Sequence, residues 1–480
     1  MTTTAHTATH AGATATLARF AAGMRYEDLP PVVVERMKTS LLDSMGCCLH
    51  GMTLPWTARV RAMVESEGAR PVASIFGTGI RTSIAGAALV NGTAGHAFEL
   101  DDIHKESILH GGSIALPVAA AFAEARIDGR PCTGRDFLTA MACGYEIGCR
   151  VGNAATTSLF FRGFHPQGTS GVFVATATAG WMLGLDPSQM QHALGIAGSQ
   201  AGGLMAAQEG AMVKRFHAGR AAQSGVYAAQ LAGNGFTGIT DVLEAPYGGY
   251  LGSYSDNPDL ARLTDGLGHE WEAAKVGYKP HASVTSIHAA LDALRQLMNE
   301  NDLVAEDIVS VDAAVSRMTH VHCAWPYLAQ GVTAAQMNLY YGLAVMAIDG
   351  MAFVAQYQEG RLADPAILDF ITRISAREDP AIDAMGPAFR HAARLQVHSR
   401  DGRRFSLEIL NRRGSAENPL SVGEVERKFA NVVAGCLSFA DTERAREWAG
   451  TIDTHDDVRP LLALLAGPRM SRGDLPEAAS

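Results

Sequence analysis

The sequence predicts a mainly α-helical protein, in which a large all-helical domain formed by both chain ends carries an inserted, smaller α+β domain. Over residues 17–271, apolar residues recur at three- and four-residue steps, the spacing of an amphipathic helix. Patterns rich in β-branched residues appear between residues 272 and 413. After a polar, proline-containing linker, helical patterns return within residues 414–480. Residues 1–16, rich in Thr and Ala, are expected to form a disordered lead-in.

Each predicted helix of the first domain ends at or near glycine or a polar turn, as helices commonly do. These segments are 30–51, 56–68, 117–129, 134–152, 172–186 and 218–238. Pro117 is expected to open its helix, because proline suits the first helical turn. Glycine beside alanine allows close approach of helix backbones. We therefore expect buried central helices.

The smaller domain is expected to mix helices and strands. Helices are predicted at 281–301 and 334–350, and a strand at 307–316. Residues 393–410 hold two strand-like runs around Asp401-Gly402, a strong hairpin signal. The helical segments 422–435 and 457–467 are expected to return to the first domain.

Composition excludes several classes of function. A net charge of −10 provides no overall basic field for nucleic acid. No apolar run is long enough to cross a membrane, and the N-terminus lacks the features of a secretory signal. The seven cysteines show no C-x-x-C spacing, which favours reduced thiols in the cytoplasm. Nucleotide-binding glycine motifs and a G-x-S-x-G elbow are absent from the sequence.

The segment HAFELDDIHKESILHGG, residues 96–112, concentrates histidines and acids after a run of small apolar residues. A metal site, an acid–base site and a polar helix end are all compatible with it. The spacing disfavours metal, because His104 and His110 are six residues apart and no H-E-x-x-H occurs. His96, His104 and Glu106 are expected to be structural or exposed.

Three further segments carry candidate residues. His165 in RGFHPQGTSG is expected at a turn before a helix, where the helix dipole lowers the pKa of an imidazole. Lys214 and Arg220 precede an alanine-rich helix and need anionic partners if buried. The partner is either a carboxylate substrate or the protein's own acids. Lys275 and Lys279, with His281, lie at the predicted domain junction, where clefts often form. An exposed basic loop is the alternative there.

Together these residues suit proton transfer at a carbon next to a carboxylate. Lysine and arginine hold anions by charge-assisted hydrogen bonds, and histidine exchanges protons near neutral pH. This chemistry requires no metal and no organic cofactor.

Six ordered segments resemble the MmgE/PrpD family, which includes 2-methylcitrate dehydratase and cis-aconitate decarboxylase. They are NGTAGHAFELDD, GYEIGCRVG, FHPQGTSG, EGAMVKRFHAGRAAQSGVYAAQLAGNGFTG, YKPHASVTSIHAALDA and AAQMNLYYGLAVMAIDG. The resemblance implies a helical domain with an inserted α+β lid, a homodimer and cofactor-free chemistry on small di- or tricarboxylates. Dehydration, decarboxylation and epimerisation of an imino-dicarboxylate all occur in the family.

The resemblance carries over residue by residue. It places an active-site acid at Glu99, where the family has an aspartate, and matches His165, Lys214 and Lys279 directly. His110 matches with a spacing that differs by about one residue. Val284 stands where a cis-aconitate decarboxylase is expected to have a histidine, and the lid hydroxyl has only His322 or Tyr327 as counterparts.

We therefore expect a cofactor-independent lyase that acts on a small polycarboxylate. The expected catalytic residues are His110, His165, Lys214, Glu99, Asp102 and Tyr145, with Glu99 or Asp102 orienting a histidine. The expected substrate-binding residues are Lys279, Arg220, His281 and Lys275. One alternative is an epimerase or isomerase of a small dicarboxylate on the same fold. The other is a non-catalytic carboxylate-binding or scaffold protein.

Overall fold

The computed structural model describes residues 12–125 and 129–467, and helices predominate in it. Residues 1–11 of the expected lead-in lie outside the described residues. The first helix already begins at Ala13, so the lead-in expected through residue 16 is wrong at its end. Within the described ranges, no helix combines the length and the hydrophobicity needed to cross a bilayer.

Helices of the first part of the chain share one large buried apolar cluster. In chain order they are α1 (Ala13–Gly23), α2 (Pro31–Met52), α3 (Pro55–Ser66), α4 (Ile84–Gly95), α5 (Gly112–Ala125), α6 (Gly134–Phe161), α7 (Pro166–Thr169), α8 (Gly171–Met182), α9 (Pro187–Gly198), α10 (Val213–Gly233), α11 (Tyr250–Tyr254) and α12 (Ala261–Thr264). A small hairpin, β1 (Ala73–Ile75) with β2 (Ile80–Thr82), accompanies them.

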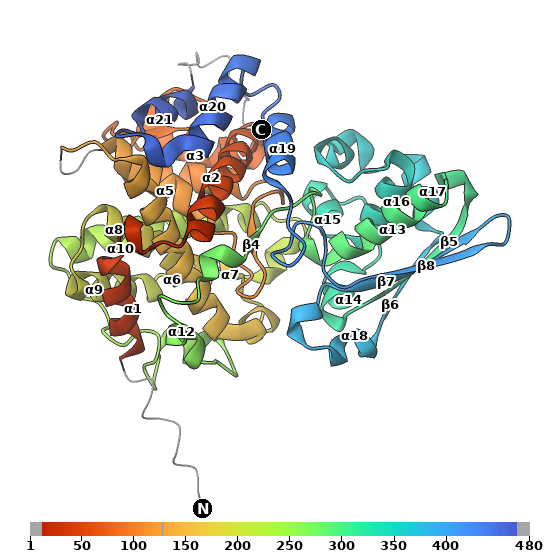
Figure 1. The fold of residues 1–480 in the computed structure, drawn as a ribbon, viewed down its shortest axis with the longest axis horizontal. Coiled ribbons are helices and arrows are strands. Elements are labelled where there is room, and N and C mark those ends of the chain that lie inside the picture. The colour runs from red at the N-terminus through yellow and green to blue at the C-terminus, as the bar shows by residue number, and fades with distance from the viewer. Residues whose placement is uncertain (1–11, 126–128, 468–480) are drawn as a thin grey trace, which may run out of the picture.

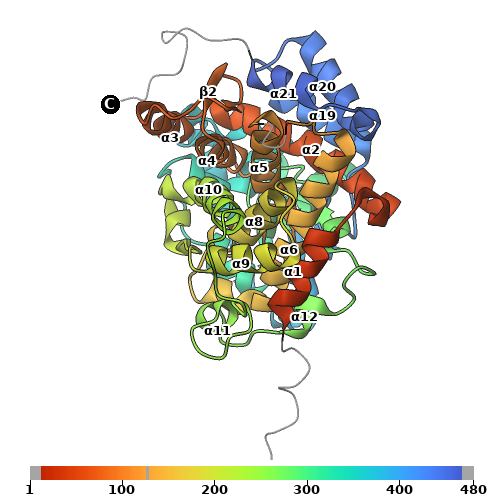
Figure 2. The same cartoon turned by 90° about the vertical axis from the view of Figure 1, so that its left-hand side faces the viewer.

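Close backbone approach holds the central helices together. In Figure 2, α4, α5, α8 and α10 lie together near the middle of this helical part, and each of the pairs α4–α10, α8–α10 and α5–α8 is in contact. A Cβ at Gly219 of α10 would lie 2.2 Å from the carbonyl oxygen of Leu89 in α4, so a larger residue has no room there. This contact places the start of α10 beside the end of α4.

Pro117 does not open its helix, contrary to the expectation. It lies inside α5, which begins at Gly112. The amide of Gly112 donates to Asp102 Oδ1, so a side chain from the preceding loop starts the helix earlier.

The C-terminal helices pack against the first helices of the chain. These are α19 (Val422–Val432), α20 (Phe439–Thr451) and α21 (Arg459–Ala466), which contact α2 or α5 (Figure 1). Lys428 of α19 forms a buried ion pair with Asp43 of α2 at 2.7 Å. Val425, Phe429 and Leu462 belong to the same apolar cluster as the first helices.

A second apolar cluster surrounds a four-stranded sheet at the other end of the molecule's long axis (Figure 1). The strand order is β6-β5-β7-β8, with β5 parallel to β6 and the other pairs antiparallel. The strands are β5 (Ile308–Val315), β6 (Ile374–Glu378), β7 (Ala393–Ser399) and β8 (Arg404–Ile409). The helices of this sheet-containing part are α13 (His288–Glu300), α14 (Arg317–Cys323), α15 (Val332–Gln336), α16 (Leu339–Asp349), α17 (Pro365–Ile371) and α18 (Pro380–Ala384).

The predicted strand at 307–316 and the hairpin around Asp401-Gly402 are confirmed. Gly402 has a φ of 87°, which glycine tolerates at a tight turn. Along β7, Ala393, Leu395 and Val397 are buried while Gln396 is exposed, so one face of the strand covers the core. The strand β6 was not predicted, because its short sequence is mostly solvent-exposed and lacks an apolar run.

Candidate active site

A cavity with many titratable side chains lies where the helical part meets the sheet-containing part. Its lining combines Glu99 and His110 from the α4–α5 loop, His165 before α7 and Lys214 from the first turn of α10. Lys279 and residues of α14 line it from the second half of the chain. Residues separated by up to about 290 positions therefore face one space. The other lining residues include Ile103, Lys105, Ile108, Phe160, Met205, Val284, Met318, His322, Arg390 and His391.

A two-residue strand pairing brings the distant halves of this site together. The strand β3 (Ile103–His104) pairs antiparallel with β4 (Val276–Gly277). Glu99 lies just before β3, and Lys279 lies two residues after β4. The loop between α4 and α5 has an unusual backbone conformation, since Glu99 has a φ of 52° and Ile108 a φ of 56°. The left-handed conformation is uncommon for non-glycine residues and often accompanies functional sites.

Glu99 contacts three cations at the base of the cavity. Lys214 forms an ion pair with its Oε1 atom, Arg215 donates to the same oxygen at 2.8 Å, and Lys279 donates to Oε2 at 2.9 Å. Burial alone would raise the pKa of Glu99, but these cations outweigh burial and hold the pKa well below its ordinary value. Glu99 is therefore ionised, and the group keeps an excess of positive charge for an anionic ligand.

Burial also changes the titration of Lys214. It lowers the pKa of Lys214 to about 8, although the neighbouring Glu99 opposes the shift. Lys214 is therefore mostly charged at pH 7, yet its ammonium loses a proton more readily than that of an exposed lysine.

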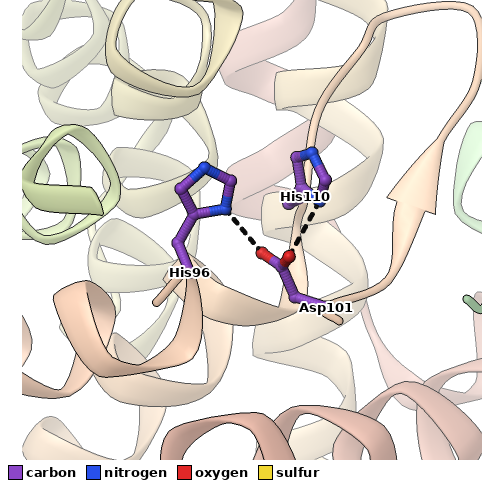
Figure 3. A group of neighbouring side chains, drawn as sticks. All are labelled: His96, Asp101 and His110. Carbon is purple, nitrogen blue, oxygen red and sulfur yellow. Dashed lines mark hydrogen bonds and ion pairs between the residues drawn. The ribbon is translucent and has the colours of Figure 1, made fainter. Parts of the chain in front are cut away.

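Asp101 lies between two histidines (Figure 3). His96 Nδ1 is hydrogen-bonded to Asp101 Oδ2 at 2.8 Å, and His110 Nδ1 lies 3.2 Å from Oδ1. A carboxylate at Nδ1 fixes the tautomer with a free Nε2 and stabilises the imidazolium that forms on protonation. The histidine-orienting acid expected at Glu99 or Asp102 is thus Asp101 in the structure.

His96 belongs to this group, although it was expected to be structural or exposed. Its ring lies 4.8 Å from that of His110 and 5.6 Å from that of His165, centroid to centroid. Burial lowers the pKa of His96 to about 3 despite Asp101, so its imidazole is neutral at pH 7. Its Nε2 atom is buried and has no hydrogen-bond partner among the described residues.

His165 is hydrogen-bonded to a second histidine, His217 of α10, with 2.8 Å between their Nδ1 atoms. Burial, together with the charge of Lys214, holds the pKa of His165 well below its ordinary value. Burial likewise lowers the pKa of His217 to about 4. Both imidazoles are therefore neutral at pH 7, and His165 can accept a proton from a ligand.

Asp102 and Tyr145 form a layer behind the cavity and do not line it. The Tyr145 hydroxyl donates to Asp102 Oδ2, while the Gly112 amide donates to Oδ1. Burial and the charge of Asp43 raise the pKa of Asp102 to about 7, although these two donors oppose the shift. Through these two hydrogen bonds, Asp102 connects the loop after α4 with Gly112 of α5 and Tyr145 of α6.

Three predicted substrate-binding residues also lie outside the cavity lining. Arg220 is exposed and contacts Gln223, and Lys275 is exposed and paired with Glu272 at 2.9 Å. His281 is buried against Asp292 at 3.0 Å. Side chains of the protein itself therefore contact all three. Lys275 fits the exposed-loop alternative that its sequence context left open, whereas buried His281 does not.

The predicted structural residues of the loop lie apart from the cavity. His104 is buried between Ser107 and Glu272, and Glu106 is paired with Arg262 at 3.2 Å. Sequence reasoning missed Asp101, Arg215 and His217 as parts of the site. All three lie within the candidate segments around Glu99 and Lys214. The spacing of residues in those segments gives no sign of which side chains contact one another.

Part of the cavity lining is apolar. Phe160, Met205 and Met318 form a separate buried cluster that Ile108 joins. The His322 ring packs edge-on against Phe160, with 4.6 Å between centroids. A ligand in the cavity therefore meets hydrocarbon as well as charged groups.

The trio His96, Asp101 and His110 could also hold a small cation, since one ligand atom from each lies within 4.8 Å of the others. Two observations favour the acid–base role. Asp101 already accepts a hydrogen bond from His96, and the Lys279 ammonium lies 3.8 Å from Asp101 Oδ1. A positive charge at this distance repels a cation.

Comparison with known proteins identifies the family of this chain. The profile of the MmgE/PrpD N-terminal domain matches residues 15–262, and that of the MmgE/PrpD C-terminal domain matches residues 281–454. The chain belongs to the MmgE/PrpD family. The resemblance inferred from the sequence motifs is thereby confirmed.

Several relatives within the MmgE/PrpD family align along almost the whole chain. The cis-aconitate decarboxylase-like protein oryM of Aspergillus oryzae is 31% identical over 95% of this chain and 97% of its own length. The cis-aconitate decarboxylase of Aspergillus terreus is 29% identical over 95% and 96%. The human cis-aconitate decarboxylase is 27% identical over 93% of each chain.

Proposed function

We propose that this MmgE/PrpD protein is a cofactor-independent lyase that acts on a small di- or tricarboxylate by moving a proton next to a carboxylate. One observation carries the proposal. His110, His165, Lys214 and Lys279 come from four distant segments and line one cavity. The relatives named cis-aconitate decarboxylase support decarboxylation of cis-aconitate or a close analogue. Dehydration of a citrate-type substrate is the other lyase reaction that the family resemblance implies.

In this proposal, Lys214 and Lys279 bind a substrate carboxylate. Both ammonium groups lie against Glu99, whose single charge does not balance the two lysines and Arg215. An anionic ligand adds the missing negative charge in a site where burial strengthens the interaction. The bound carboxylate then accepts charge that develops at the neighbouring carbon.

The histidines exchange the proton. In a decarboxylation, the bond to the leaving carboxylate breaks, its electron pair passes to the neighbouring carbon and carbon dioxide leaves. The Lys214 ammonium, or an imidazolium of His110 stabilised by Asp101, then supplies the proton to that carbon. In a dehydration, one histidine removes a proton and an acid protonates the departing hydroxide. His110 with Asp101, and His165 with His217, provide two such groups.

Two positions in the cavity lining differ from what the family resemblance implies. Val284 lines the cavity where a histidine was expected, and His322 lines it where an aromatic hydroxyl was expected. Tyr327, the other counterpart, donates to the carbonyl oxygen of Leu362 outside the lining. We propose that the substrate differs from cis-aconitate where it meets these side chains.

We also propose that residues 272–413 act as a lid. Val284, Met318, His322 and Arg390 line the cavity from this segment, whereas His110, His165 and Lys214 line it from the helical part. The homodimer that the resemblance implies, and a cytoplasmic location, stay predictions.

Proton NMR in heavy water with citrate, 2-methylcitrate and cis-aconitate tests the proposal. Loss of carbon dioxide with one deuterium in the product indicates a decarboxylase. Loss of water from citrate or 2-methylcitrate to an unsaturated acid, or hydration of cis-aconitate to a product with one carbon-bound deuterium, indicates a dehydratase. Deuterium entering recovered substrate without a new product would indicate the epimerase alternative. A small dicarboxylate, an imino-disuccinate for example, belongs in the same panel for that reason.

Variants connect the reaction to the cavity. His165→Ala and Lys214→Ala are each expected to lower turnover by about 10² or more. Arg220→Gln and Lys275→Gln are matched controls, because both cations are exposed and lie outside the cavity lining. Near-normal turnover in both cavity variants would overturn the proposal, and the absence of any thermal stabilisation by these acids would favour a scaffold role.

A further inference from the structure

The cavity has a second set of cations, separate from those around Glu99. Arg390 lines it from the segment just before β7, and Lys105 lines it from the turn after β3. His391 lines it beside Arg390, but burial holds its pKa well below the ordinary value, so its imidazole is neutral. Arg390 lies within the electrostatic influence of Glu106 and Glu417. Lys214 instead experiences the charges of Glu99, Arg215 and Lys279. The two sets of cations therefore have different neighbours.

Arg390 is buried without an anionic partner. Its side chain is 6% exposed, and among the described residues no carboxylate oxygen lies within ion-pair distance of its guanidinium. It donates instead to two backbone carbonyl oxygens, that of Pro387 at 3.1 Å and that of Lys105. Its Nε atom is buried and has no partner in the described part of the chain. Buried arginine is rarely left in this state, because desolvating a charge is costly unless an anion offsets it.

Two further cations lie near Arg390, neither of which offers it an anion. Lys105 contacts Glu417 and donates to the carbonyl oxygen of Ala388 at 3.1 Å. Arg412, 2% exposed, donates to a backbone carbonyl oxygen and also has a buried, unpartnered Nε. Burial lowers the pKa of Arg390 to about 10, so the guanidinium is still charged at neutral pH.

We propose that Arg390, with Lys105 beside it, forms a second carboxylate subsite in the cavity. This inference rests on the proposed function and makes it more specific. The first subsite, at Lys214 and Lys279, holds the carboxylate next to the reacting carbon, and the Arg390 subsite holds another carboxylate of the same substrate. A guanidinium can grip a carboxylate through two parallel hydrogen bonds, which fixes the orientation as well as the position of the ligand.

The subsite has a consequence for substrate choice. A monocarboxylate leaves Arg390 unpaired, so it forgoes the interaction that a di- or tricarboxylate makes. Lys279 and Arg390 belong to residues 272–413, and Lys214 belongs to the helical part, so a substrate with two carboxylates contacts both parts of the molecule.

A competing role for Arg390 is purely structural, because its two backbone hydrogen bonds join the segment before β7 to the turn after β3. Isothermal titration separates the two roles with three unreactive acids that share a straight chain: butyrate, glutarate and tricarballylate. The wild-type protein is expected to bind glutarate and tricarballylate at least tenfold more tightly than butyrate.

In Arg390→Gln, we expect this preference to fall to less than about threefold, with butyrate affinity unchanged. Arg390→Lys keeps the charge and is expected to keep part of the preference, and it decides the matter if Arg390→Gln does not fold. Arg61→Gln is the matched control, because Arg61 is also 6% exposed but pairs with Glu65 outside the cavity lining, and it should preserve the wild-type preference.

The outcomes separate the two proposals. A full preference for glutarate in Arg390→Gln or Arg390→Lys would overturn the subsite and leave the proposed function intact. Wild-type protein that binds none of the three acids would overturn the proposed function, and the subsite with it.

Discussion

The Nδ1 atoms of His165 and His217 lie 2.8 Å apart in a buried contact. A hydrogen bond between two neutral imidazoles needs one Nδ1–H donor and one Nδ1 acceptor, so the two rings carry opposite tautomers. His165 lines the cavity and His217 does not. The residue behind the cavity wall therefore fixes the tautomer of the residue that meets the ligand.

Replacing His217 tests this dependence. His217→Leu is expected to lower kcat about 10-fold, because His165 loses the partner that fixes its tautomer. The neighbouring imidazole also contributes to the low pKa of His165, so the acidic limb of the kcat/KM profile should move to higher pH. His217→Asn keeps a hydrogen-bonding group and should recover part of the loss. An unchanged pH profile in His217→Leu would contradict this role.

Asp101→Asn should abolish most activity without weakening substrate binding. The amide cannot accept protons from both His96 and His110 or stabilise an imidazolium, so kcat is expected to fall by about 10² or more at nearly constant KM. Asp102→Asn makes the same chemical change one residue further on, where the carboxylate contacts Tyr145 and Gly112. Steady-state kinetics should separate the two, and equal losses would contradict the assignment of Asp101.

Glu99→Gln should destabilise the protein and increase its dependence on anions. Three buried cations lose their common partner, which is expected to cost about 3–5 kcal/mol of the free energy of unfolding. Tricarballylate should therefore raise the melting temperature more in the variant than in the wild type. Exposed Glu67 provides the matched control, as Glu67→Gln, and a variant as stable as wild type would refute the argument.

Asp102 predicts a pH dependence of stability. Its pKa is about 7 in the folded protein and near 3.8 in the unfolded chain, so the folded state binds the proton more tightly. Its contribution to stability is therefore present below pH 3.8 and is lost as the pH rises through 7. Asp102→Asn, which resembles the protonated carboxyl, should gain about 1–3 kcal/mol relative to wild type between pH 5 and pH 8. Urea unfolding at both pH values measures this, and a constant difference would exclude the raised pKa.

Much of the fold follows from local sequence patterns. The segment expected at 30–51 forms α2 at Pro31–Met52, and the Asp401-Gly402 turn joins β7 to β8, because helix periodicity and turn chemistry act over a few residues. The strand β6 escaped prediction because its pairing with β5 is parallel and its residues are largely exposed. The helix start predicted at Pro117 was wrong because a residue outside the helix, Asp102, sets the start of α5 at Gly112.

Within the site, the sequence motifs identified segments better than individual contacts. His110, His165, Lys214 and Lys279 were selected from their motifs and line one cavity. The choice among Glu99, Asp101 and Asp102 could not be made, because side chains in an irregular loop follow no period. Glu99 adopts a φ of 52° and contacts three cations, and Asp101 contacts the histidines.

The sequence by itself determined the family, the helical character and the residue types available for proton transfer, since these depend on local order and composition. The tertiary structure decided which of those residues meet. Glu99 and Lys279 are 180 positions apart, and the β3–β4 pairing brings them within 2.9 Å. The same folding leaves Arg220, Lys275 and His281 outside the cavity and places Arg390 inside it. Contacts over such separations depend on how whole elements pack, and no local pattern records that packing.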